Sequence, residues 1–381
     1  MKKFLCFFLA LALLSASGCR DDRKPVDQLS LVSFLSFGPA REPGNKYRVH
    51  IIRPLFEPTR EKDAFITHSE GTGLFDALET IQRREIKLLV FGKVRTVSIN
   101  EQLAVDGINP ILRQLDNIAD FSVRAYIIVN QGETEDIEAV NLAENRRTGF
   151  AVADTIQTAR DKQLVPLRNF TDTMKLLASP YQELTLPLGA FDLAENEFGV
   201  GGTAVFRRDR MVGKLTQHET MIYSLLAETV NILSIVIPPA EIGNSDFIQL
   251  AFTVRHLRRD VRVHLEGNRP VLTVRLRPTV DLKDYVEKEL EEPDRYWKNT
   301  VDSEQLARFD AIITKYLKKK TNELIAKAQQ EFRSDIFGFG KAVKVQQNRY
   351  FNSVEWLDEF PDAKITVDVD VTIRQFEGFG P

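Results

Sequence analysis

The chain has only two cysteines among its 381 residues, Cys6 and Cys19, and both lie within its first nineteen residues. A body without cysteine forms no internal disulfide, has no thiolate nucleophile and cannot ligate zinc through sulfur. Its stability must therefore come from hydrophobic cores, and a chain of this length can build two or three of them. Hydrophobic residues at 43% and charged residues at 28% are typical of a globular protein.

The first nineteen residues have the layout of an export signal. Lys2 and Lys3 form a positive end, residues 4–14 carry no charge, and the small residues 15–18 precede Cys19. Eleven apolar residues rise about 16 Å as a helix, which is too short for a hydrocarbon core of about 30 Å. We therefore predict that residues 1–18 are a signal peptide that is removed.

Cys19 has a particular place in this signal. Ala16-Ser17-Gly18-Cys19 resembles the bacterial lipobox, in which the cysteine thiol receives a diacylglyceryl group before cleavage. The resemblance implies a lipoprotein that is lipidated at Cys19, with residues 19–27 as a polar tether and the body held outside a membrane by its acyl chains. The alternative is an ordinary secreted protein in which Cys19 has no special role.

The charge of the chain argues against nucleic acid as a partner. Removal of Lys2 and Lys3 from a chain of net charge −3 leaves about −5, which is unlike the basic footprint of a nucleic-acid binder. No later stretch approaches eighteen consecutive apolar residues, so we expect the body to lie outside the bilayer.

The N-terminal half alternates between strand and helix patterns. Periodicity predicts a hairpin of two strands over Leu29–Phe37 and Tyr47–Ile52, followed by a helix over 73–84. A strand over Lys87–Ile99, buried on both faces, a helix over Ile108–Leu115 and a strand over Val123–Val129 come next. Residues 133–180 are expected to be mainly helical. This order is typical of an α/β arrangement, which we assign to an N-terminal domain of residues 28–195.

A small middle domain is predicted at residues 196–245. Prolines and glycines break any regular period in Pro180–Gly202, and we place the domain boundary near residue 195. Beyond it, Thr203–Phe206 and Met211–Leu215 indicate a hairpin, and Glu219–Asn231 indicates a helix.

Residues 246–381 are predicted to form an α+β domain. Strands are expected over Phe247–Leu257, Val261–Leu265 and Val271–Arg277, the last two joined by a type II′ turn at Gly267-Asn268. A long helix is expected over residues 301–332, and the alternation from Ile365 to Arg374 indicates a half-buried strand. The predicted fold class is therefore mixed α/β and α+β, with the long helix on an antiparallel or mixed sheet in the third of three domains.

The sequence offers little catalytic or metal chemistry. No two of the five histidines are spaced three or four residues apart on a predicted helix, and the HExxH, GxSxG and P-loop patterns are missing. We therefore expect no enzyme activity, no metal and no cofactor. The basic run Lys318-Lys319-Lys320 has two interpretations, a solvated helix face or a contact with anionic lipid headgroups.

The most specific string is Ser334-Asp335-Ile336-Phe337-Gly338-Phe339-Gly340, directly after the long helix. Two glycines between aromatic residues indicate a tight helix exit, with Gly338 or Gly340 at positive φ. Together with the lipobox, this string resembles the Ger(x)C family, the GerAC-like C-subunit lipoproteins of spore germinant receptors. Three other stretches are similar to the family in order and spacing: Gly73–Leu78, Leu89–Lys93 and Gly202–Phe206 with Met211–Gly213.

The resemblance implies a three-domain lipoprotein that acts in spore germination on the outer face of the spore inner membrane. Its implied partners are two membrane subunits of the receptor, an A-type and a B-type subunit, and no catalytic residue is carried over. The family string is transferred only as a signature at Ser334, Asp335, Phe337, Gly338, Phe339 and Gly340. Whether these residues contact a partner or shape a turn is left open by the sequence.

Two other functions stay open at this point. A solute-binding lipoprotein of a transporter would need two similar α/β lobes around a cleft. A secreted hydrolase would need a catalytic triad or a carboxylate pair that assembles only in the fold.

Overall fold

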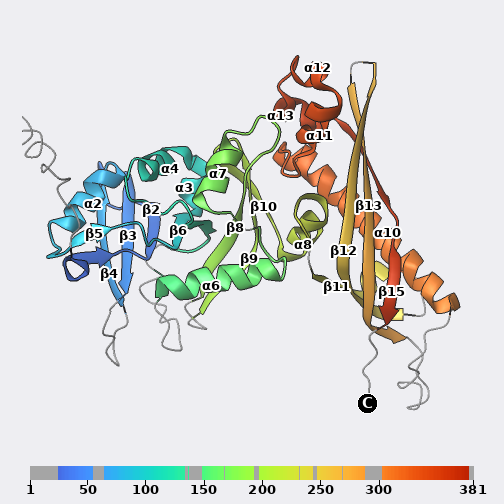
Figure 1. Cartoon of the computed structure of the whole chain (residues 1–381), viewed down its shortest axis with the longest axis horizontal. Helices are drawn as coiled ribbons and strands as arrows, with labels where there is room; N and C mark the ends of the chain where they lie inside the picture. Colours follow the sequence, from blue (N-terminus) through green and yellow to red (C-terminus); the bar gives the residue numbers. More distant parts are fainter. Residues whose placement is uncertain are drawn as a thin grey trace, which may run out of the picture.

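The structure, a computed structural model, describes residues 25–54, 64–133, 136, 148–166, 168–192, 197–230, 232–242, 247–267, 269–287 and 303–376. Figure 1 shows two units side by side, an N-terminal sheet with its helices (blue to green) and a long hairpin with a long helix (yellow to red). Both sheets are mixed and both are covered by helices, which confirms the predicted mixed α+β class.

The N-terminal unit is built on an eight-stranded sheet in the order β10-β9-β8-β7-β6-β2-β3-β4. Strands β2, β6, β7 and β8 run parallel to one another, and the outer strands pair antiparallel. The strands are β2 (Phe34–Pro39), β3 (Tyr47–Pro54), β4 (Ala64–Gly71), β6 (Thr96–Asn100), β7 (Tyr126–Asn130), β8 (Thr185–Asp192), β9 (Glu197–Arg207) and β10 (Arg210–Leu215).

Helices cover both faces of this sheet (Figure 1). The larger core lies on one face, where the sheet packs against α2 (Leu74–Gln82), α3 (Glu101–Asp106), α4 (Asn109–Asp116) and α7 (Phe170–Leu177). The single helix α6 (Thr148–Asp161) covers the other face over a smaller core. Because side chains alternate along a strand, Leu35 faces the first core and its neighbour Phe34 faces the second.

The sequence predictions for this unit are partly confirmed. The hairpin of β2 and β3, the helices near 73–84 and 108–115 and the strand ending at Val129 are all present. The single strand predicted over Lys87–Ile99 is wrong, because a turn in which Val94 N donates to Phe91 O separates β5 (Leu88–Val90) from β6. Leu29–Phe37 is likewise divided, and its first part, β1 (Leu29–Leu31), pairs with β5 in a separate small sheet.

The C-terminal unit is built on a five-stranded mixed sheet. Its long hairpin of β12 (Phe247–Glu266) and β13 (Arg269–Glu287) is joined by β11 (Leu233–Ile237), β14 (Lys364–Val369) and β15 (Thr372–Phe376). Helix α10 (Ser303–Lys327) continues as the π-helical η3 (Ala328–Phe332) and buries one apolar face against this sheet. The long helix predicted at 301–332 is confirmed over its described part.

Three strand predictions in this unit need correction. The strands predicted over Phe247–Leu257 and Val261–Leu265 are one strand, β12, whose pairing absorbs three register shifts. The alternating stretch Ile365–Arg374 contributes to two strands, β14 and β15, which are separated at Asp370 and Val371 and both pair parallel with β13. Glu266 pairs with Arg269 across the predicted two-residue turn, and Gly267 has a φ of +65°; Asn268 lies outside the described residues, so the turn type stays a prediction.

The segment between the two predicted larger domains is shared between the sheets. Strand β8 and the first part of β9 lie in Pro180–Gly202, which was expected to be irregular. Strands β9 and β10 form the predicted hairpin, and β11 joins the C-terminal sheet. Helix α8 (Gln217–Ala227), predicted at 219–231, lies between the two units (Figure 1). The eight-stranded sheet thus continues across residue 195, and the division into three domains stays a prediction. The two units differ in strand number and topology, unlike the similar lobes of the solute-binding alternative.

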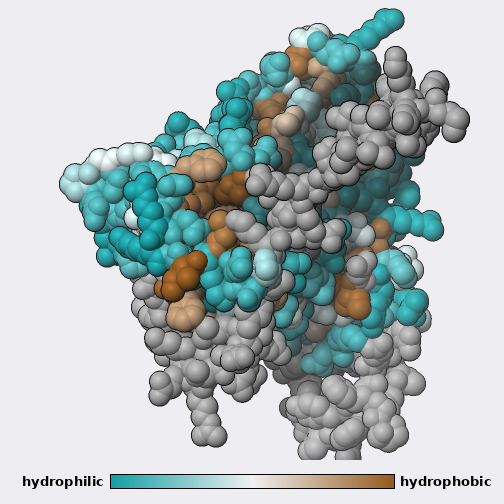
Figure 2. Space-filling view, turned by 60° about the vertical axis from the view of Figure 1, so that its left-hand side comes forward, coloured by the Kyte–Doolittle hydropathy of each residue, from teal (hydrophilic) through white to brown (hydrophobic). Residues whose placement is uncertain are grey.

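Short helices complete the C-terminal unit: α11 (Phe339–Gln346), α12 (Asn348–Phe351) and α13 (Trp356–Glu359). Within the described ranges, no helix combines the length and apolarity that a membrane crossing requires. The face in Figure 2 is mainly hydrophilic, and its hydrophobic atoms form small separate patches.

Candidate functional site

The signature string lies where the two units meet. It follows η3, and its residues Ser334 and Asp335 are both 0% exposed. Arg333, at the end of η3, and Gly338 have left-handed backbone conformations, with φ of +52° and +74°. The chain therefore turns sharply twice within six residues before α11 begins, as the two glycines indicate.

Asp335 organises this turn through its side chain. Its Oδ1 accepts hydrogen bonds from the backbone N–H groups of Gly338 (2.9 Å) and Phe339 (3.2 Å), and its Oδ2 accepts from Gly340 N (2.9 Å) and Trp356 Nε1 (2.7 Å). Burial raises the pKa of Asp335 to about 6, although these four donors act to lower it. The carboxylate acts as an internal cap for the first turn of α11.

Gly340 is required by close packing. A Cβ atom at this position would lie 2.2 Å from Cδ1 of Trp356 and 2.7 Å from the carbonyl oxygen of Tyr181. The two aromatic residues of the string stack on each other, with the ring centroids of Phe337 and Phe339 5.0 Å apart, and both are buried. The string is thus part of the protein core.

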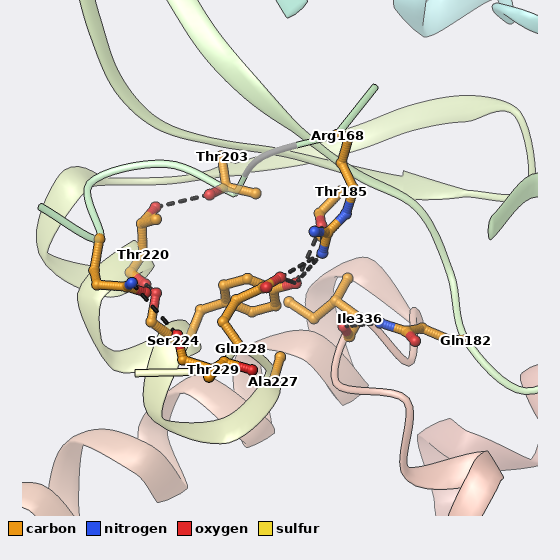
Figure 3. Close-up of polar contacts among 12 residues, drawn as sticks. Arg168, Gln182, Thr185, Thr203, Thr220, Ser224, Ala227, Glu228, Thr229 and Ile336 are labelled. Carbon is orange, nitrogen blue, oxygen red and sulfur yellow. Dashed lines mark hydrogen bonds and ion pairs between the residues drawn. The ribbon is translucent and has the colours of Figure 1, made fainter. Parts of the chain in front are cut away.

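Three hydrogen bonds tie the string to the N-terminal unit. Ser334 Oγ donates to the carbonyl oxygen of Phe206 on β9 (2.6 Å), and Glu183 N donates to the carbonyl oxygen of Asp335 (2.9 Å). Gln182 Nε2 donates to the carbonyl oxygen of Ile336 (3.2 Å), a contact that Figure 3 shows at its right-hand side. The residues before β8 are therefore fastened to the turn after the long helix.

A buried polar network makes a second connection between the units (Figure 3). Arg168, which precedes α7, forms an ion pair with Glu228 at the end of α8. The Tyr223 hydroxyl donates to the same Glu228 oxygen (3.1 Å) and lies 3.1 Å from the hydroxyl of Thr185 on β8. We call Arg168, Thr185, Tyr223 and Glu228 the junction network.

The opposite charges of Arg168 and Glu228 in the junction network stabilise each other. Burial disfavours both ionised groups, but Arg168 lowers the pKa of Glu228, and Tyr223 and Glu228 raise the pKa of Arg168. Burial also raises the pKa of Tyr223, so its hydroxyl stays protonated and can donate. Removal of one partner would leave the other charged group buried without compensation.

Outer ion pairs surround this core of the junction. Arg207 on β9 binds Asp358 on α13 (2.9 Å), and Lys327 on α10 binds Glu219 on α8 (2.7 Å). Among the described residues, no group of three or more His, Cys, Asp or Glu side chains is arranged to hold a metal ion. The junction connects the two units through buried hydrogen bonds and ion pairs.

The predicted site residues have different outcomes. Cys19 lies outside the described residues, and its lipidation stays a prediction. The structure brings all six signature residues together, and it buries every one of them except Gly338, which is half-buried. This burial supports the turn interpretation of the string, whose side chains face the core.

The basic run on α10 is matched by acidic side chains. Lys319 and Lys320 both bind Glu241, with distances of 2.8 Å and 2.7 Å. Lys318 lies 3.9 Å from Asp368 on β14. This pairing favours the interpretation of a solvated helix face.

The sequence did not point to the junction network or to Trp356. Arg168 and Glu228 are 60 residues apart, and no local pattern distinguishes them from other charged residues. Trp356 offers a weak signal, because tryptophan is rare in this chain and a buried indole N–H needs an acceptor.

The fold and the junction define an α+β protein of two sheet units that are connected by a buried turn, and comparison with known families identifies the class. The family model "Spore germination protein N-terminal domain" matches residues 22–190, and "Spore germination B3/ GerAC like, C-terminal" matches residues 201–377. The chain belongs to the GerAC-like family of spore germination proteins, as the signature string predicts.

Two of its relatives are similar over nearly their whole length. Spore germination protein GerQC of Bacillus cereus is 20% identical, with 98% of this chain and 99% of the relative covered. The putative spore germination protein YfkR of Bacillus subtilis is also 20% identical, over 98% of this chain and 97% of the relative. The crystal structure of the GerBC protein has a TM-score of 0.57 at 13% identity and covers 89% of this chain and 96% of that chain, which shows a shared fold.

Proposed function

We propose that this protein is the lipid-anchored C subunit of a nutrient germinant receptor and acts in spore germination through contacts with membrane subunits. The observation that carries the proposal is the match of the two GerAC-like family models, which together span most of the chain. The signal-like residues 1–18 followed by Cys19 add support for the anchor.

The proposed role is non-enzymatic. The junction connects the two units through buried groups, and its carboxylate at Asp335 is occupied by four N–H donors. Such a body would present fixed surfaces to A-type and B-type membrane subunits while lipid at Cys19 keeps it at the outer face of the spore inner membrane. Two acyl chains are enough for stable anchoring.

The anchor is tested by Cys19→Ala in a spore-forming host that lacks its own copy of the gene. We expect the variant to lose incorporation of labelled palmitate, to leave the membrane fraction and to slow the response to nutrients. Cys6→Ala is the matched control, since Cys6 is the other cysteine and lies in the predicted signal peptide. A Cys19→Ala protein that stays membrane-bound and germinates normally would contradict the anchoring proposal.

The partner contacts are tested by photo-crosslinking from exposed hydrophobic positions. Ile86, Val123 and Val345 are 103%, 55% and 75% exposed and lie on three different parts of the chain. At least one position should crosslink to a membrane subunit of the receptor in intact spores, while a probe at the buried Val343 should not. Crosslinks from none of the three, with no co-purification of a membrane subunit, would refute the receptor role.

A further inference from the structure

A basic pocket lies at one end of the central strands of the N-terminal sheet. Its volume is about 650 Å³, within the range that holds a small organic ligand. It lies at the amino ends of the parallel strands β2, β6 and β7, and the residues that line it include Ser33, Arg95 and Tyr126 from these strand starts.

The strand starts hold the pocket walls firmly. Arg95 N donates to the carbonyl oxygen of Ser33, and Tyr126 N donates to the carbonyl oxygen of Arg95, both at 2.8 Å. The guanidinium carbon of Arg95 lies 5.6 Å from the centre of the Phe150 ring, so its charge is supported by an aromatic face. One wall of the pocket is therefore a positioned cation with aromatic side chains beside it.

The pocket carries three cationic side chains, Lys93, Arg95 and Arg124, and none of the described residues that line it is acidic. Within the part of the chain that the structure describes, no carboxylate forms an ion pair with any of the three. Elsewhere in the protein basic residues are commonly paired, as Lys320 is with Glu241 and Arg207 with Asp358. All three side chains are exposed, so their charges are accessible to a ligand.

We propose that this pocket binds a small organic phosphate. A monocarboxylate would leave two of the three cations uncompensated, whereas a phosphate monoester carries a charge between about −1.5 and −2 at neutral pH. Arginine guanidinium groups match phosphate oxygens in a bidentate geometry, and lysine binds them as a point charge. Tyr126 and Phe150 provide a surface for the organic part of the ligand. The inference does not depend on the proposed receptor role.

The test is a binding titration of the purified full-length protein in detergent with phenyl phosphate, which combines a dianion with an aromatic ring. We expect saturable binding that weakens about tenfold or more in each of Lys93→Gln, Arg95→Gln and Arg124→Gln, since each removes a charge-assisted contact. Arg84→Gln is the matched control, because Arg84 is exposed on the same unit and does not line the pocket. Its binding should equal that of the unaltered protein.

A second arm identifies the source of the phosphate. Vesicles that contain phosphatidic acid, whose headgroup is a phosphate monoester, are compared with vesicles of phosphatidylcholine as competitors of phenyl phosphate. Displacement by phosphatidic acid alone would support the pocket as a site for a lipid phosphate monoester, and no displacement would support a soluble organic phosphate. Absence of saturable phenyl phosphate binding, or equal binding in the three pocket variants and the control, would overturn the proposal.

Discussion

Asp335 shows how one buried carboxylate can fix a turn. It lies between the long helix and α11, and each of its two oxygens accepts two N–H groups. A buried donor that loses its acceptor costs about 1–3 kcal/mol, so the four donors make this side chain difficult to replace. The acid in the family string is therefore explained by the geometry of the turn.

We expect Asp335→Ala to lower the free energy of unfolding by about 3–5 kcal/mol, because it leaves four buried N–H groups without their acceptor. Asp335→Asn should be intermediate, since its amide NH₂ replaces one oxygen and faces two donors. Urea unfolding measures both values. Asp362→Ala, at an exposed aspartate of the same unit, should change stability by less than about 0.5 kcal/mol; equal effects at both positions would contradict this account of the turn.

His50 illustrates a buried titratable group on the face of the sheet covered by α6. It is 0% exposed, and its ring centroid lies 5.1 Å from that of His68 on the neighbouring strand β4. Burial, followed by the positive charges of His68, Arg48 and Arg41, lowers the pKa of His50 to about 3. The His50 ring is therefore neutral in the folded protein at neutral and mildly acidic pH.

This pKa predicts a loss of stability in acid. In the unfolded chain His50 takes up a proton below about pH 6.5, whereas in the folded protein it does so only near pH 3, so acidification favours unfolding. We expect His50 to account for a loss of about 2 kcal/mol between pH 7 and pH 5. Between pH 7 and pH 5, urea unfolding should show a change in stability that is about 2 kcal/mol less favourable in the unaltered protein than in His50→Gln.

The unaltered protein must be compared with His50→Gln, because protonation of Asp335 raises the stability of the folded protein as the pH falls, whereas protonation of His50 lowers it. The pKa of Asp335 is raised to about 6, so the folded protein takes up this proton first and gains stability as the pH falls from about 6 to 4. His256→Gln, at an exposed histidine, is the control and should keep the pH dependence of the unaltered protein. The prediction fails if His50→Gln keeps it as well.

At the residue scale, the sequence indicated the residues that belong to a short local motif, but it did not indicate residues that interact only in the folded protein. The two glycines of the string are needed as predicted, Gly338 for its positive φ and Gly340 for its contact with Trp356. Arg168 and Glu228 could not be predicted, because their pairing depends on how α8 lies against the N-terminal sheet. Charged residues are common in this chain, and burial alone distinguishes these two.

At the scale of elements, the outer edge of β12 is protected by side chains. Strand β11 pairs with β12 only over Leu250–Val254, and no other described strand pairs with that edge further along. There, Gln346 on α11 accepts from Val263 N (2.9 Å) and donates to the carbonyl oxygen of Val261 (2.7 Å). A glutamine amide thus takes the place of a neighbouring strand and covers an edge that could otherwise pair with another chain.

We expect Gln346→Ala to cost about 1–3 kcal/mol, because it leaves one backbone donor and one acceptor of β12 without their partners. Hydrogen exchange at the Val263 amide should become faster, and the protein should associate more readily at high concentration. Gln102→Ala on α3 is the control, since Gln102 is exposed and its side chain has no such contact. Unchanged exchange at Val263 would show that α11 does not protect this edge.

The sequence predicted elements well where one period continued and poorly where strands were interrupted. The apolar face of α10 gives a helical period over its length, and the prediction succeeded. The stretch Lys87–Ile99 is apolar throughout, so nothing in its period reveals the turn at Phe91–Val94 that sends its two parts to different sheets. Glycines in β8 and β9 hid two strands that the pairing with neighbours stabilises.

At the scale of the whole molecule, the chain passes once from the N-terminal sheet, which ends with β10, to the C-terminal sheet, which begins with β11. The N-terminal sheet takes strands from both sides of residue 195, and α8 and the signature turn both pack against it. A reading of local patterns places boundaries where composition changes, but it cannot show which sheet a strand joins. The junction therefore became visible only in the three-dimensional structure.

The junction predicts that the two units unfold together. Breaking it with Arg168→Met should cost about 3–5 kcal/mol, because Glu228 would remain buried without its cation. Two probes follow the two units in urea. Tryptophan fluorescence reports on the C-terminal half of the sequence, where both tryptophans lie, and hydrogen exchange at Val97 reports on the N-terminal sheet. In the unaltered protein, both probes should show the same single transition. In Arg168→Met the two probes should report separate transitions, since the units would no longer stabilise each other.

Two further variants distinguish a joint from a general loss of stability. Arg168→Met combined with Glu228→Gln removes both charges, so it should recover part of the lost free energy, as expected for a coupled buried pair. Arg258→Met, at an exposed arginine on β12, should leave a single transition. If the two probes still show one transition in Arg168→Met, the junction network is not needed to couple the two units. The contacts of the signature turn would then couple them. In that case Ser334→Ala, which removes the hydrogen bond to Phe206, should separate the two transitions.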